Sequence, residues 1–327
     1  MSLRAIPKVE TADFYIDLAF RRGKEKAGRL PIQRQENWMS RIISVETTKV
    51  AEVGSDLAER LRDVIKSFPE FDKLSPFYLD LVKCVTDFDD LKHSLGAVNW
   101  AVHRIEEFTK YHLGLMRRSE TESGLLGVKR GYYGRVSSAV KQIKKSLAFL
   151  EDARLKMRKF PVIKTSIPTV IIAGYPNVGK TTLLSLLTGS NPKIASYPFT
   201  TQQLMIGYTL IGEEKFQFID TPGLLDRPLN KRNSIELQAI LALKHISGRI
   251  LFIVDASESC GYSVKDQISL LRQIEKSFGI PTTVIISKAD ITPKSSIEEA
   301  KRLLKTDFII SSADTKAIEE LKNSFIS

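Results

Sequence analysis

The apolar residues in the first half of the chain recur at helical intervals. Leu57, Leu61 and Val64 lie three or four positions apart, and the apolar residues from 136 to 150 keep the same rhythm. This spacing places apolar side chains on one face of each helix, and such faces are buried when helices pack together. We therefore predict that residues 1–160 form an antiparallel helical bundle, with Trp38 and Trp100 in its core.

The pattern changes after Phe160 and Pro161. Short runs rich in β-branched residues now alternate with helical stretches, and these runs are TVIIAG, LMIGYTLIG, FQFID, RILFIVDA, TTVIIS and FIIS. This alternation predicts a mostly parallel, doubly wound sheet of six strands over residues 168–327. The segment KFPVIKTSIP has two prolines and no periodicity, which predicts a linker at residues 161–167.

Basic residues are concentrated in the helical half. The chain has a formal net charge of +11, and residues 1–165 contain 31 Lys and Arg against 22 Asp and Glu. Residues 117–164 alone hold 13 basic and 4 acidic side chains. Such a concentration of positive charge is typical of a surface that binds a polyanion.

Cysteine spacing and hydropathy indicate where the chain works. Cys84 and Cys260 lie far apart and have no Cys or His at metal-ligand spacing, so neither a disulfide nor a zinc site is predicted. No run of 18 apolar residues occurs, so we expect no membrane partner. The expectation is a monomer in the cytoplasm.

The sequence GYPNVGKT matches the Gly-x4-Gly-Lys-Thr pattern of a phosphate-binding loop. It follows the apolar run TVIIA and precedes a helical stretch that begins near Lys180. Backbone N–H groups of such a loop point at phosphate oxygens, the lysine contacts the β- and γ-phosphates, and the next hydroxyl binds Mg²⁺. Thr181 is the expected magnesium ligand. The expected phosphate-binding residues are Gly174, Tyr175, Pro176, Asn177, Val178, Gly179, Lys180, Thr181 and Thr182.

A second motif, DTPG, argues against a chance match. It follows the run FQFI, with Asp220 forty positions after Lys180, where a carboxylate near Mg²⁺ and an N–H that senses the γ-phosphate are needed. Between the two motifs, YPFTTQQ offers Thr200 or Thr201 to Mg²⁺ and the γ-phosphate. We prefer Thr201, and the alternative is a solvated loop threonine. The expected switch residues are Thr200, Thr201, Asp220, Thr221, Pro222 and Gly223.

Two polar loops near the end of the chain predict recognition of guanine. The run TTVIIS leads into SKAD, and the run FIIS leads into a second loop. Asp290 can accept hydrogen bonds from N1 and the exocyclic amino group of guanine, a pattern that adenine does not offer. The residues thus predict GTP and GDP as ligands and a GTPase as the enzyme class. The expected guanine-binding residues are Ser287, Lys288, Asp290, Ser312 and Ala313.

Together these motifs resemble the Obg-like P-loop GTPases. Within that group, RNSIELQAILALKH, DASESCGY, FPEFDKLSPFYLDL and KRGYYGRVSSAVKQIKKSL are similar to the Nog branch, as a short, non-eukaryotic-type member. The resemblance implies hydrolysis of GTP with Mg²⁺ and assembly of the large ribosomal subunit through contact with ribosomal RNA. It also implies association with ribosomes, and a nucleolar location only in a eukaryotic cell. The long basic C-terminal extension of larger eukaryotic members has no counterpart here, so contacts made by that extension are not expected.

Four residues bear on how far the resemblance extends. Ser287 stands where most relatives have a longer Asn that reaches guanine N7 and the phosphate loop, so weaker guanine selectivity is expected. Leu224 follows DTPG where Ras-like enzymes have a water-orienting Gln, which predicts slow intrinsic hydrolysis. Asn177 resembles a potassium ligand of other GTPases, or is simply a hydrogen-bonding loop residue. Arg227 is a candidate arginine finger, and a solvated switch residue is the more ordinary interpretation.

The segment KRGYYGR combines two tyrosines with basic residues and glycines. This composition suits stacking on unpaired bases next to phosphate contacts, and the alternative is an inter-helix loop whose tyrosines pack on the bundle. Two other function classes stay open: a structural RNA-binding module that holds nucleotide passively, and an Obg-like signalling GTPase that acts on proteins. The candidate RNA-binding residues are Lys129, Arg130, Tyr132, Tyr133, Arg135, Lys141, Lys144 and Lys145.

Overall fold

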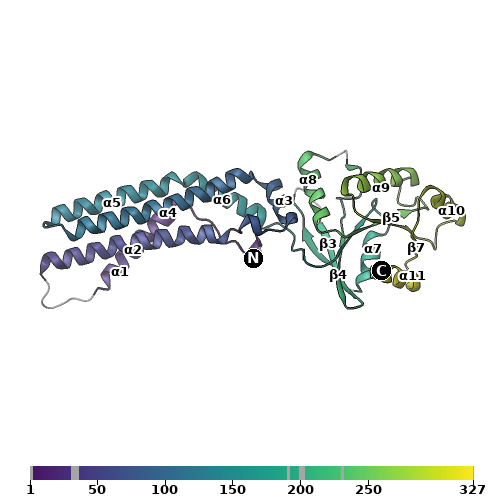
Figure 1. Cartoon of the computed structure of the whole chain (residues 1–327), viewed down its shortest axis with the longest axis horizontal. Helices are drawn as coiled ribbons and strands as arrows, with labels where there is room; N and C mark the ends of the chain where they lie inside the picture. Colours follow the sequence, from purple (N-terminus) through teal and green to yellow (C-terminus); the bar gives the residue numbers. More distant parts are fainter. Residues whose placement is uncertain (1–2, 31–36, 190–191, 199–202, 230–231, 327) are drawn as a thin grey trace. The chain divides into compact units, whose positions relative to one another are not determined.

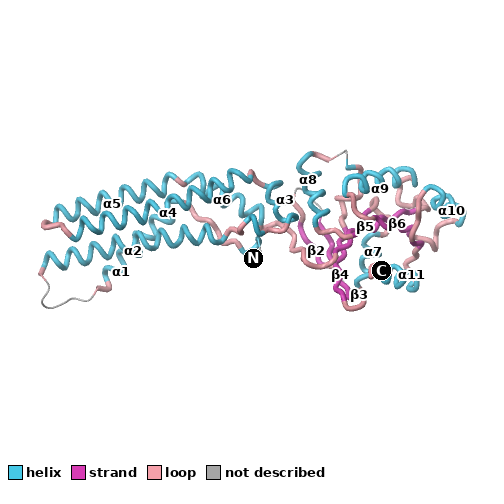
Figure 2. The backbone as a smooth tube through the Cα atoms, viewed as in Figure 1, coloured by secondary structure: helices cyan, strands magenta, loops and turns pink. Residues whose placement is uncertain are grey.

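The computed structural model describes residues 3–30, 37–189, 192–198, 203–229 and 232–326. The chain divides into two compact units, one made of Met1–Glu70 with Thr86–Arg158 and the other of Phe71–Val85 with Lys159–Ser327. Figure 2 shows helices in the first unit and both helices and strands in the second. Within the described residues, no helix combines the length and the apolar composition required to cross a lipid bilayer.

The first unit is a bundle of long helices that lie side by side (Figure 1). Four of the helices begin with a side chain that accepts a hydrogen bond from a backbone N–H of the first turn, and these caps are Thr11, Asn37, Asp87 and Thr121. The predicted apolar faces point inward, with Leu57 and Leu61 fully buried. The predicted antiparallel bundle is confirmed. Its helices are α1 (Ala12–Gly28), α2 (Trp38–Ser67), α4 (Phe88–Arg117), α5 (Glu122–Gln142) and α6 (Lys144–Met157).

The two tryptophans do not lie in the core of the bundle, so that prediction is wrong. The exposed fraction is 72% for Trp38 and 42% for Trp100. Trp100 lies two positions after the fully buried Val98, and two positions along an α-helix turn a side chain by about 200°. Trp100 is therefore directed to the outer face of α4, and Trp38 is the first residue of α2.

A glycine allows α2 to approach α4 and α5 closely. A Cβ atom at Gly54 would lie 2.9 Å from the hydroxyl oxygen of Tyr132 and against the side chain of Thr109. Thr109 Oγ1 donates to the carbonyl of Ile105 at 2.7 Å and lies 2.9 Å from Tyr132 Oη. Neither hydroxyl can move away from an added methyl group without disturbing this part-buried hydrogen-bond pair.

We expect Gly54→Ala to lower the free energy of unfolding by ~1–3 kcal/mol, because overpacking forces side chains out of well-packed positions. Gly114→Ala is the matched control, since Gly114 is also helical but has nothing within 4 Å of an added Cβ. This second change should be neutral or stabilising. Urea unfolding followed by circular dichroism measures both variants. Equal losses of stability would show that close helix approach is not the reason.

The second unit is built on a single sheet. Among the described residues it has seven strands in the order β2-β3-β4-β1-β5-β6-β7. The central strands β1 and β5 are parallel and almost entirely buried, as expected for a sheet covered on both faces, while β3 runs antiparallel to both β2 and β4. The strands are β1 (Thr169–Ala173), β2 (Lys193–Ser196), β3 (Gln203–Ile211), β4 (Glu214–Asp220), β5 (Arg249–Asp255), β6 (Thr282–Ser287) and β7 (Phe308–Ile309).

The predicted mostly parallel, doubly wound sheet is confirmed, but the count of six strands is wrong. The additional strand is β2, a short edge strand with the sequence KIAS and three exposed residues. A run of four residues is too short to show the apolar pattern of a strand. In Figure 1, α8 and α9 lie on one side of the sheet and α7 and α11 on the other. The helices are α7 (Lys180–Thr188), α8 (Ser234–Ala242), α9 (Val264–Phe278), α10 (Lys294–Leu303) and α11 (Thr315–Asn323).

One helix of the second unit comes from the N-terminal half of the sequence. Helix α3 (Pro76–Val85) packs against α8, and Asp80 Oδ2 lies 2.9 Å from His245 Nε2. The hydroxyl of Tyr78 donates to the carbonyl of Pro161 at 3.0 Å and accepts from the N–H of Ile163 at 3.0 Å. Residues 71–85 and 159–327 thus form the second unit, and the segment 161–167 lies within it.

Candidate nucleotide-binding site

The predicted phosphate loop connects the end of β1 to the start of α7. Three of its residues have positive φ angles: 136° at Gly174, 63° at Asn177 and 102° at Gly179. A Cβ atom at Gly174 would lie 2.6 Å from the carbonyl oxygen of Ile253 on the neighbouring strand. Only glycine fits this combination of backbone angle and close approach. The loop therefore has the tight curvature that a ring of inward-facing N–H groups requires.

Lys180 is buried at the beginning of α7, beneath this loop. Its Nζ donates to the carbonyl of Gly174 at 3.0 Å and to the carbonyl of Tyr175 at 2.8 Å. Burial lowers the pKa of the ammonium group, and the nearby carboxylates of Asp220 and Asp226 only partly offset this effect. The hydrogen-bond partners described for this ammonium are carbonyls rather than carboxylates, so its positive charge remains available to an anion in the loop.

Thr181 and Asp220 form the second part of the site. Thr181 Oγ1 donates to Asp220 Oδ2 at 2.7 Å, and Asp220 is fully buried at the end of β4. Its other oxygen, Oδ1, has no hydrogen-bond partner among the described residues. Burial raises the pKa of this carboxyl group, although the Thr181 hydroxyl and Lys180 lower it in part. Hydroxyl and carboxylate oxygens are the ligands that Mg²⁺ prefers, so these two residues fit a magnesium ion.

The DTPG segment is held by its own neighbours. The N–H of Gly223 donates to Asp226 Oδ2 at 2.6 Å. Arg232 Nη2 donates to the carbonyls of Gly223 at 2.6 Å and Leu224 at 2.7 Å, and its guanidinium lies 3.6 Å from Asp226. Asp226 and Arg232 both follow the motif, and sequence reasoning assigned a role to neither of them. The polar run DRPLNKR after DTPG was the available signal.

The remaining predicted switch residues are placed as follows. Thr221 is fully buried and its hydroxyl donates to the carbonyl of Ile172 at 3.0 Å, which ties the motif to β1. Pro222 lies in the turn that follows β4. Thr200 and Thr201 lie outside the described residues. Leu224 is buried, whereas the side chain of Arg227 is exposed.

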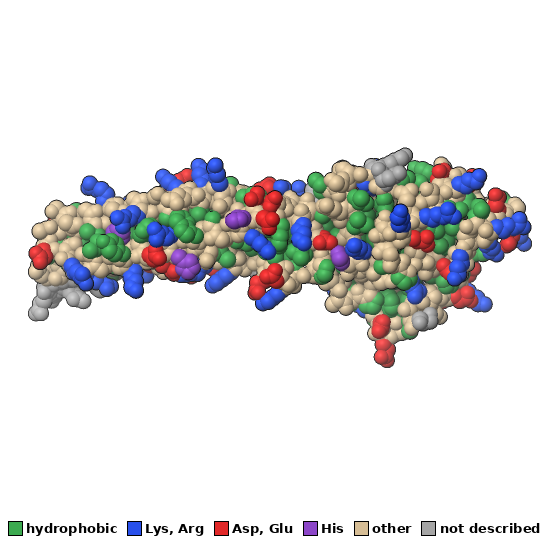
Figure 3. Space-filling model, turned by 45° about the horizontal axis from the view of Figure 1, so that its top comes forward, with side chains coloured by type: hydrophobic (Ala, Val, Ile, Leu, Met, Phe, Trp, Pro, Cys, Tyr) green, Lys and Arg blue, Asp and Glu red, His purple; other side chains and the backbone are tan. Residues whose placement is uncertain are grey.

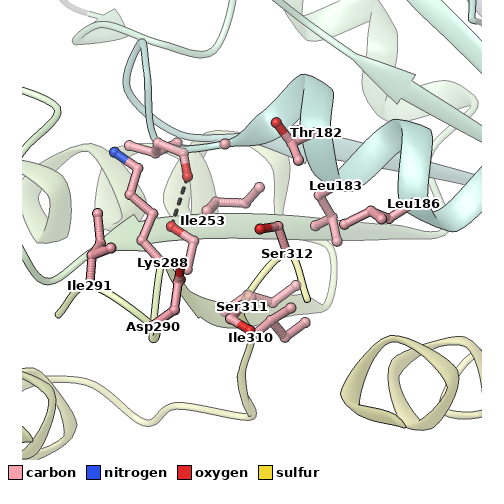
Figure 4. A pocket seen from close by; sticks show the side chains of 14 residues that line it. Thr182, Leu183, Leu186, Ile253, Lys288, Asp290, Ile291, Ile310, Ser311 and Ser312 are labelled. Carbon is pink, nitrogen blue, oxygen red and sulfur yellow. Dashed lines mark hydrogen bonds between the residues drawn. The ribbon is translucent and has the colours of Figure 1, made fainter. Parts of the chain in front are cut away.

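A cavity of about 180 Å³ lies beside the phosphate loop (Figure 4). It brings together residues from the ends of β6 and β7 that the sequence predicted for guanine, among them Ser287, Lys288, Asp290 and Ser312. Ser311 lines the cavity and Ala313 is not among its lining residues. Sequence reasoning missed the apolar walls, since ordinary apolar residues carry no distinct signal of a binding site. These walls are formed by Leu183, Leu186, Ile253, Ile285, Ile291 and Ile310.

Lys288 is fixed by a buried carboxylate that the sequence analysis did not single out. Its Nζ lies 2.8 Å from Asp255 Oδ2 and donates to Ser259 Oγ at 2.8 Å. Burial raises the pKa of Asp255, but hydrogen bonds from Lys288, Ser257 and Ser259 outweigh it, so the net pKa is lowered. The acidic and serine-rich run DASES after a buried strand was the signal for this network.

Models of known protein families match both halves of the chain. The model of the NOG1 N-terminal helical domain matches residues 3–164, and the model of nucleolar GTP-binding protein 1 (NOG1) matches residues 234–290. An uncharacterized protein of Methanocaldococcus jannaschii is 41% identical over 295 residues, which is 90% of this chain and 83% of that protein. The chain belongs to the NOG1 family.

Eukaryotic relatives in the NOG1 family are longer. Nucleolar GTP-binding protein 1 of Encephalitozoon cuniculi is 36% identical over 256 residues, which is 78% of this chain and 48% of that protein. The chain therefore spans about half the length of this relative. A crystal structure assigned to nucleolar GTP-binding protein 1 of Plasmodium falciparum is 33% identical and covers 50% of this chain and 87% of that chain, with a TM-score of 0.43.

In the NOG1 helical unit, the buried Tyr132 is not accessible for stacking on RNA bases, so that part of the prediction is wrong. Residues 129–135 lie within the continuous helix α5 and not in a loop, and Tyr133 is partly buried. Tyr132 is fully buried, and the ring of Tyr133 packs on Phe20 with centroids 4.6 Å apart. Burial raises the pKa of Tyr133 to about 12. Lys129 is paired with Glu46 at 2.7 Å.

The other candidate RNA-binding residues of the NOG1 helical unit are accessible. Figure 3 shows basic side chains spread along this unit on the face in view, rather than gathered into one patch. Arg135 lies over the ring of Phe108, 5.9 Å from its centroid. The exposed candidates are Arg130, Arg135, Lys141, Lys144 and Lys145.

Proposed function

We propose that this NOG1-family chain binds GTP and GDP, hydrolyses GTP to GDP and phosphate, and assists assembly of the large ribosomal subunit. The observation that carries the proposal is the hydrogen bond between the exposed Thr181 and the buried Asp220, next to Lys180 and under a glycine-rich loop. An ammonium group, a hydroxyl and a carboxylate oxygen without a partner suit a polyphosphate that carries Mg²⁺. The names of the relatives support guanine nucleotide as the ligand.

The chemistry is electrostatic. The ammonium of Lys180 and the N–H groups of residues 174–182 spread the charge that develops when the bond between the β- and γ-phosphates breaks. When bound, Mg²⁺ held by Thr181, Thr201 and, less directly, Asp220 supplies further positive charge at the same oxygens. Water is the nucleophile, so no covalent enzyme intermediate forms. Because Leu224 cannot orient that water, intrinsic hydrolysis is slow.

The carboxylate of Asp226 accepts a hydrogen bond from the N–H of Gly223, the group that is proposed to sense the γ-phosphate. GTP must displace this carboxylate from Gly223, whereas GDP has no γ-phosphate and leaves it in place. We therefore expect Asp226→Ala to raise the affinity for GTP relative to GDP by about threefold to tenfold, the range of one hydrogen bond. Calorimetry with both nucleotides measures the ratio, and an unchanged ratio would contradict this competition.

Two further residues of the second unit are proposed to support hydrolysis. The exposed Asn177 is the candidate potassium ligand, and the exposed Arg227 is the candidate arginine finger. Turnover should fall when sodium replaces potassium, and Arg227→Ala should lower turnover without weakening GTP binding. Equal rates in the two salts would remove the potassium role, and an unaffected Arg227→Ala rate would remove the arginine finger.

Ribosomal RNA is the proposed partner of the helical domain, with the ribosome in the cytoplasm as its place of action. Residues 117–164 carry 13 basic against 4 acidic side chains, and Lys141, Lys144 and Lys145 are exposed. Replacing these three lysines with glutamate should weaken RNA binding and reduce its salt dependence. The slope of log K against log salt concentration should fall by ~2 for three lost phosphate contacts. Glutamates at Lys294, Lys305 and Lys316, exposed in the second unit, form the matched control.

GTP turnover with and without precursors of the large ribosomal subunit tests the function as a whole. We expect stimulation by the precursor particles. A structural module that holds nucleotide passively, which a buried Leu224 would permit, should show no stimulation. A signalling GTPase that acts on proteins should show no salt-sensitive binding to RNA.

A further inference from the structure

Ser287 contacts the phosphate loop directly. Its Oγ lies 2.7 Å from the carbonyl oxygen of Val178 and 3.3 Å from the carbonyl oxygen of Val254. The expectation that this short side chain reaches the phosphate loop less well than Asn is therefore wrong. The end of β6 comes so close to the loop that a serine is long enough.

The geometry also determines which way the hydroxyl points. Both neighbouring atoms are carbonyl oxygens, which only accept hydrogen bonds, and a serine hydroxyl has a single proton. That proton is directed to Val178, the nearer acceptor. No side-chain donor is left at Ser287 for an acceptor on a bound base. The adjacent Lys288 ammonium is held by Asp255 and Ser259 on the other side.

We propose that Ser287 is a positioning residue that ties the base pocket to the phosphate loop and does not read the base. This inference rests on the proposed binding of guanine nucleotides. Guanine is then recognised at N1 and its amino group by Asp290, while N7, on the opposite edge of the purine, receives no hydrogen bond from Ser287. The site therefore recognises guanine at N1 and its amino group, and a change at N7 should leave the affinity unaltered.

Three nucleotides separate the two edges. GTP has both, inosine triphosphate lacks the amino group, and 7-deaza-GTP has carbon in place of N7. For the wild-type chain with Mg²⁺, calorimetry should give equal affinities for GTP and 7-deaza-GTP within about twofold, and weaker binding of inosine triphosphate by about threefold to tenfold. A several-fold loss with 7-deaza-GTP overturns the proposal, whether the donor to N7 is Ser287, Thr182, Ser311 or Ser312.

Two variants test the positioning role. Ser287→Ala removes the tie to Val178 and should weaken GTP and 7-deaza-GTP by the same factor, roughly threefold to tenfold. Ser287→Asn brings an amide donor toward the base and should make the chain discriminate against 7-deaza-GTP by a similar factor. Unchanged affinities in Ser287→Ala would show that the tie has no effect and overturn the assignment.

The outcomes also distinguish this inference from the proposed function. If wild-type chain binds neither GTP nor GDP, the proposed function fails and this inference fails with it. If GTP binds but 7-deaza-GTP binds much more weakly, this inference fails and the proposed function stands. Equal binding of inosine triphosphate and GTP would contradict recognition of the amino group by Asp290 and overturn the one-edge reading.

Discussion

Lys180→Ala is expected to reduce the affinity for GTP and GDP by at least ~100-fold, because a charge-assisted contact in a buried site contributes about 1.5–3 kcal/mol for each hydrogen bond. The ammonium is already desolvated, and its hydrogen-bond partners within the described part of the chain are the carbonyls of Gly174 and Tyr175. Most of the free-energy cost of removing this ammonium group from water is therefore already present in the nucleotide-free chain. An alanine leaves the polyphosphate without its nearest positive charge.

The same burial predicts how affinity depends on pH. The pKa of Lys180 is lowered from its ordinary value of 10.5, so without nucleotide the group loses its proton at a lower pH than an exposed lysine does. Affinity for nucleotide should therefore begin to fall at a lower pH than it would with an unperturbed lysine. In Lys180→Ala, this part of the pH dependence should be absent.

Calorimetry at neutral and alkaline pH measures both effects. Lys294→Ala is the control, because Lys294 is exposed on α10 and does not line the cavity. The wild-type and both variant chains should have similar circular dichroism spectra. Retention of near-wild-type affinity in Lys180→Ala would contradict the position assigned to the phosphates.

The parts of the site that could be predicted are those coded by local sequence. A glycine with a positive φ angle, as at Gly174, and a lysine at the first position of a helix are fixed by chain neighbours. The position of Asp220 follows from the rule that parallel strands present their carboxyl ends at one edge of the sheet. Local sequence is therefore enough to place these residues at the ends of their strands.

The parts that could not be predicted depend on contacts between distant segments. Helix α3 reads as one more amphipathic helix of the bundle, and only its packing on α8 assigns it to the second unit. Tyr132 looked accessible because glycines flank the two tyrosines, but the helix continues through Gly131 and Gly134. The short β2 strand pairs with β3 through backbone hydrogen bonds, which leave little trace in the sequence.

Asp220→Asn is expected to stabilise the nucleotide-free chain and to remove its response to Mg²⁺. The wild-type carboxylate is fully buried with one oxygen unpartnered, and such a group costs on the order of 1 kcal/mol or more. Removing its charge should raise the Tm by about 2–4 °C per kcal/mol regained. The asparagine oxygen can still accept the hydrogen bond that Thr181 donates.

The sign of the pH dependence follows from the raised pKa of Asp220. As pH falls through that raised value, the folded chain takes up a proton that the unfolded chain takes up only near the ordinary value of 3.8. The wild-type chain is therefore stabilised by acidification in this window. The stability advantage of Asp220→Asn should shrink there as the pH is lowered.

Addition of nucleotide reverses the order of the two chains. GTP with Mg²⁺ at 100 times its Kd should stabilise the wild-type chain by ~2.7 kcal/mol, whereas Asp220→Asn should gain much less, and the same amount with or without Mg²⁺. Thermal unfolding in the four combinations of GTP and Mg²⁺ measures this, with Asp17→Asn, an exposed change on α1, as the control. A nucleotide-free Asp220→Asn chain less stable than wild type would mean that the carboxylate is satisfied without a metal ion. Full stabilisation of the variant by Mg²⁺ and GTP would mean that the ion is held elsewhere.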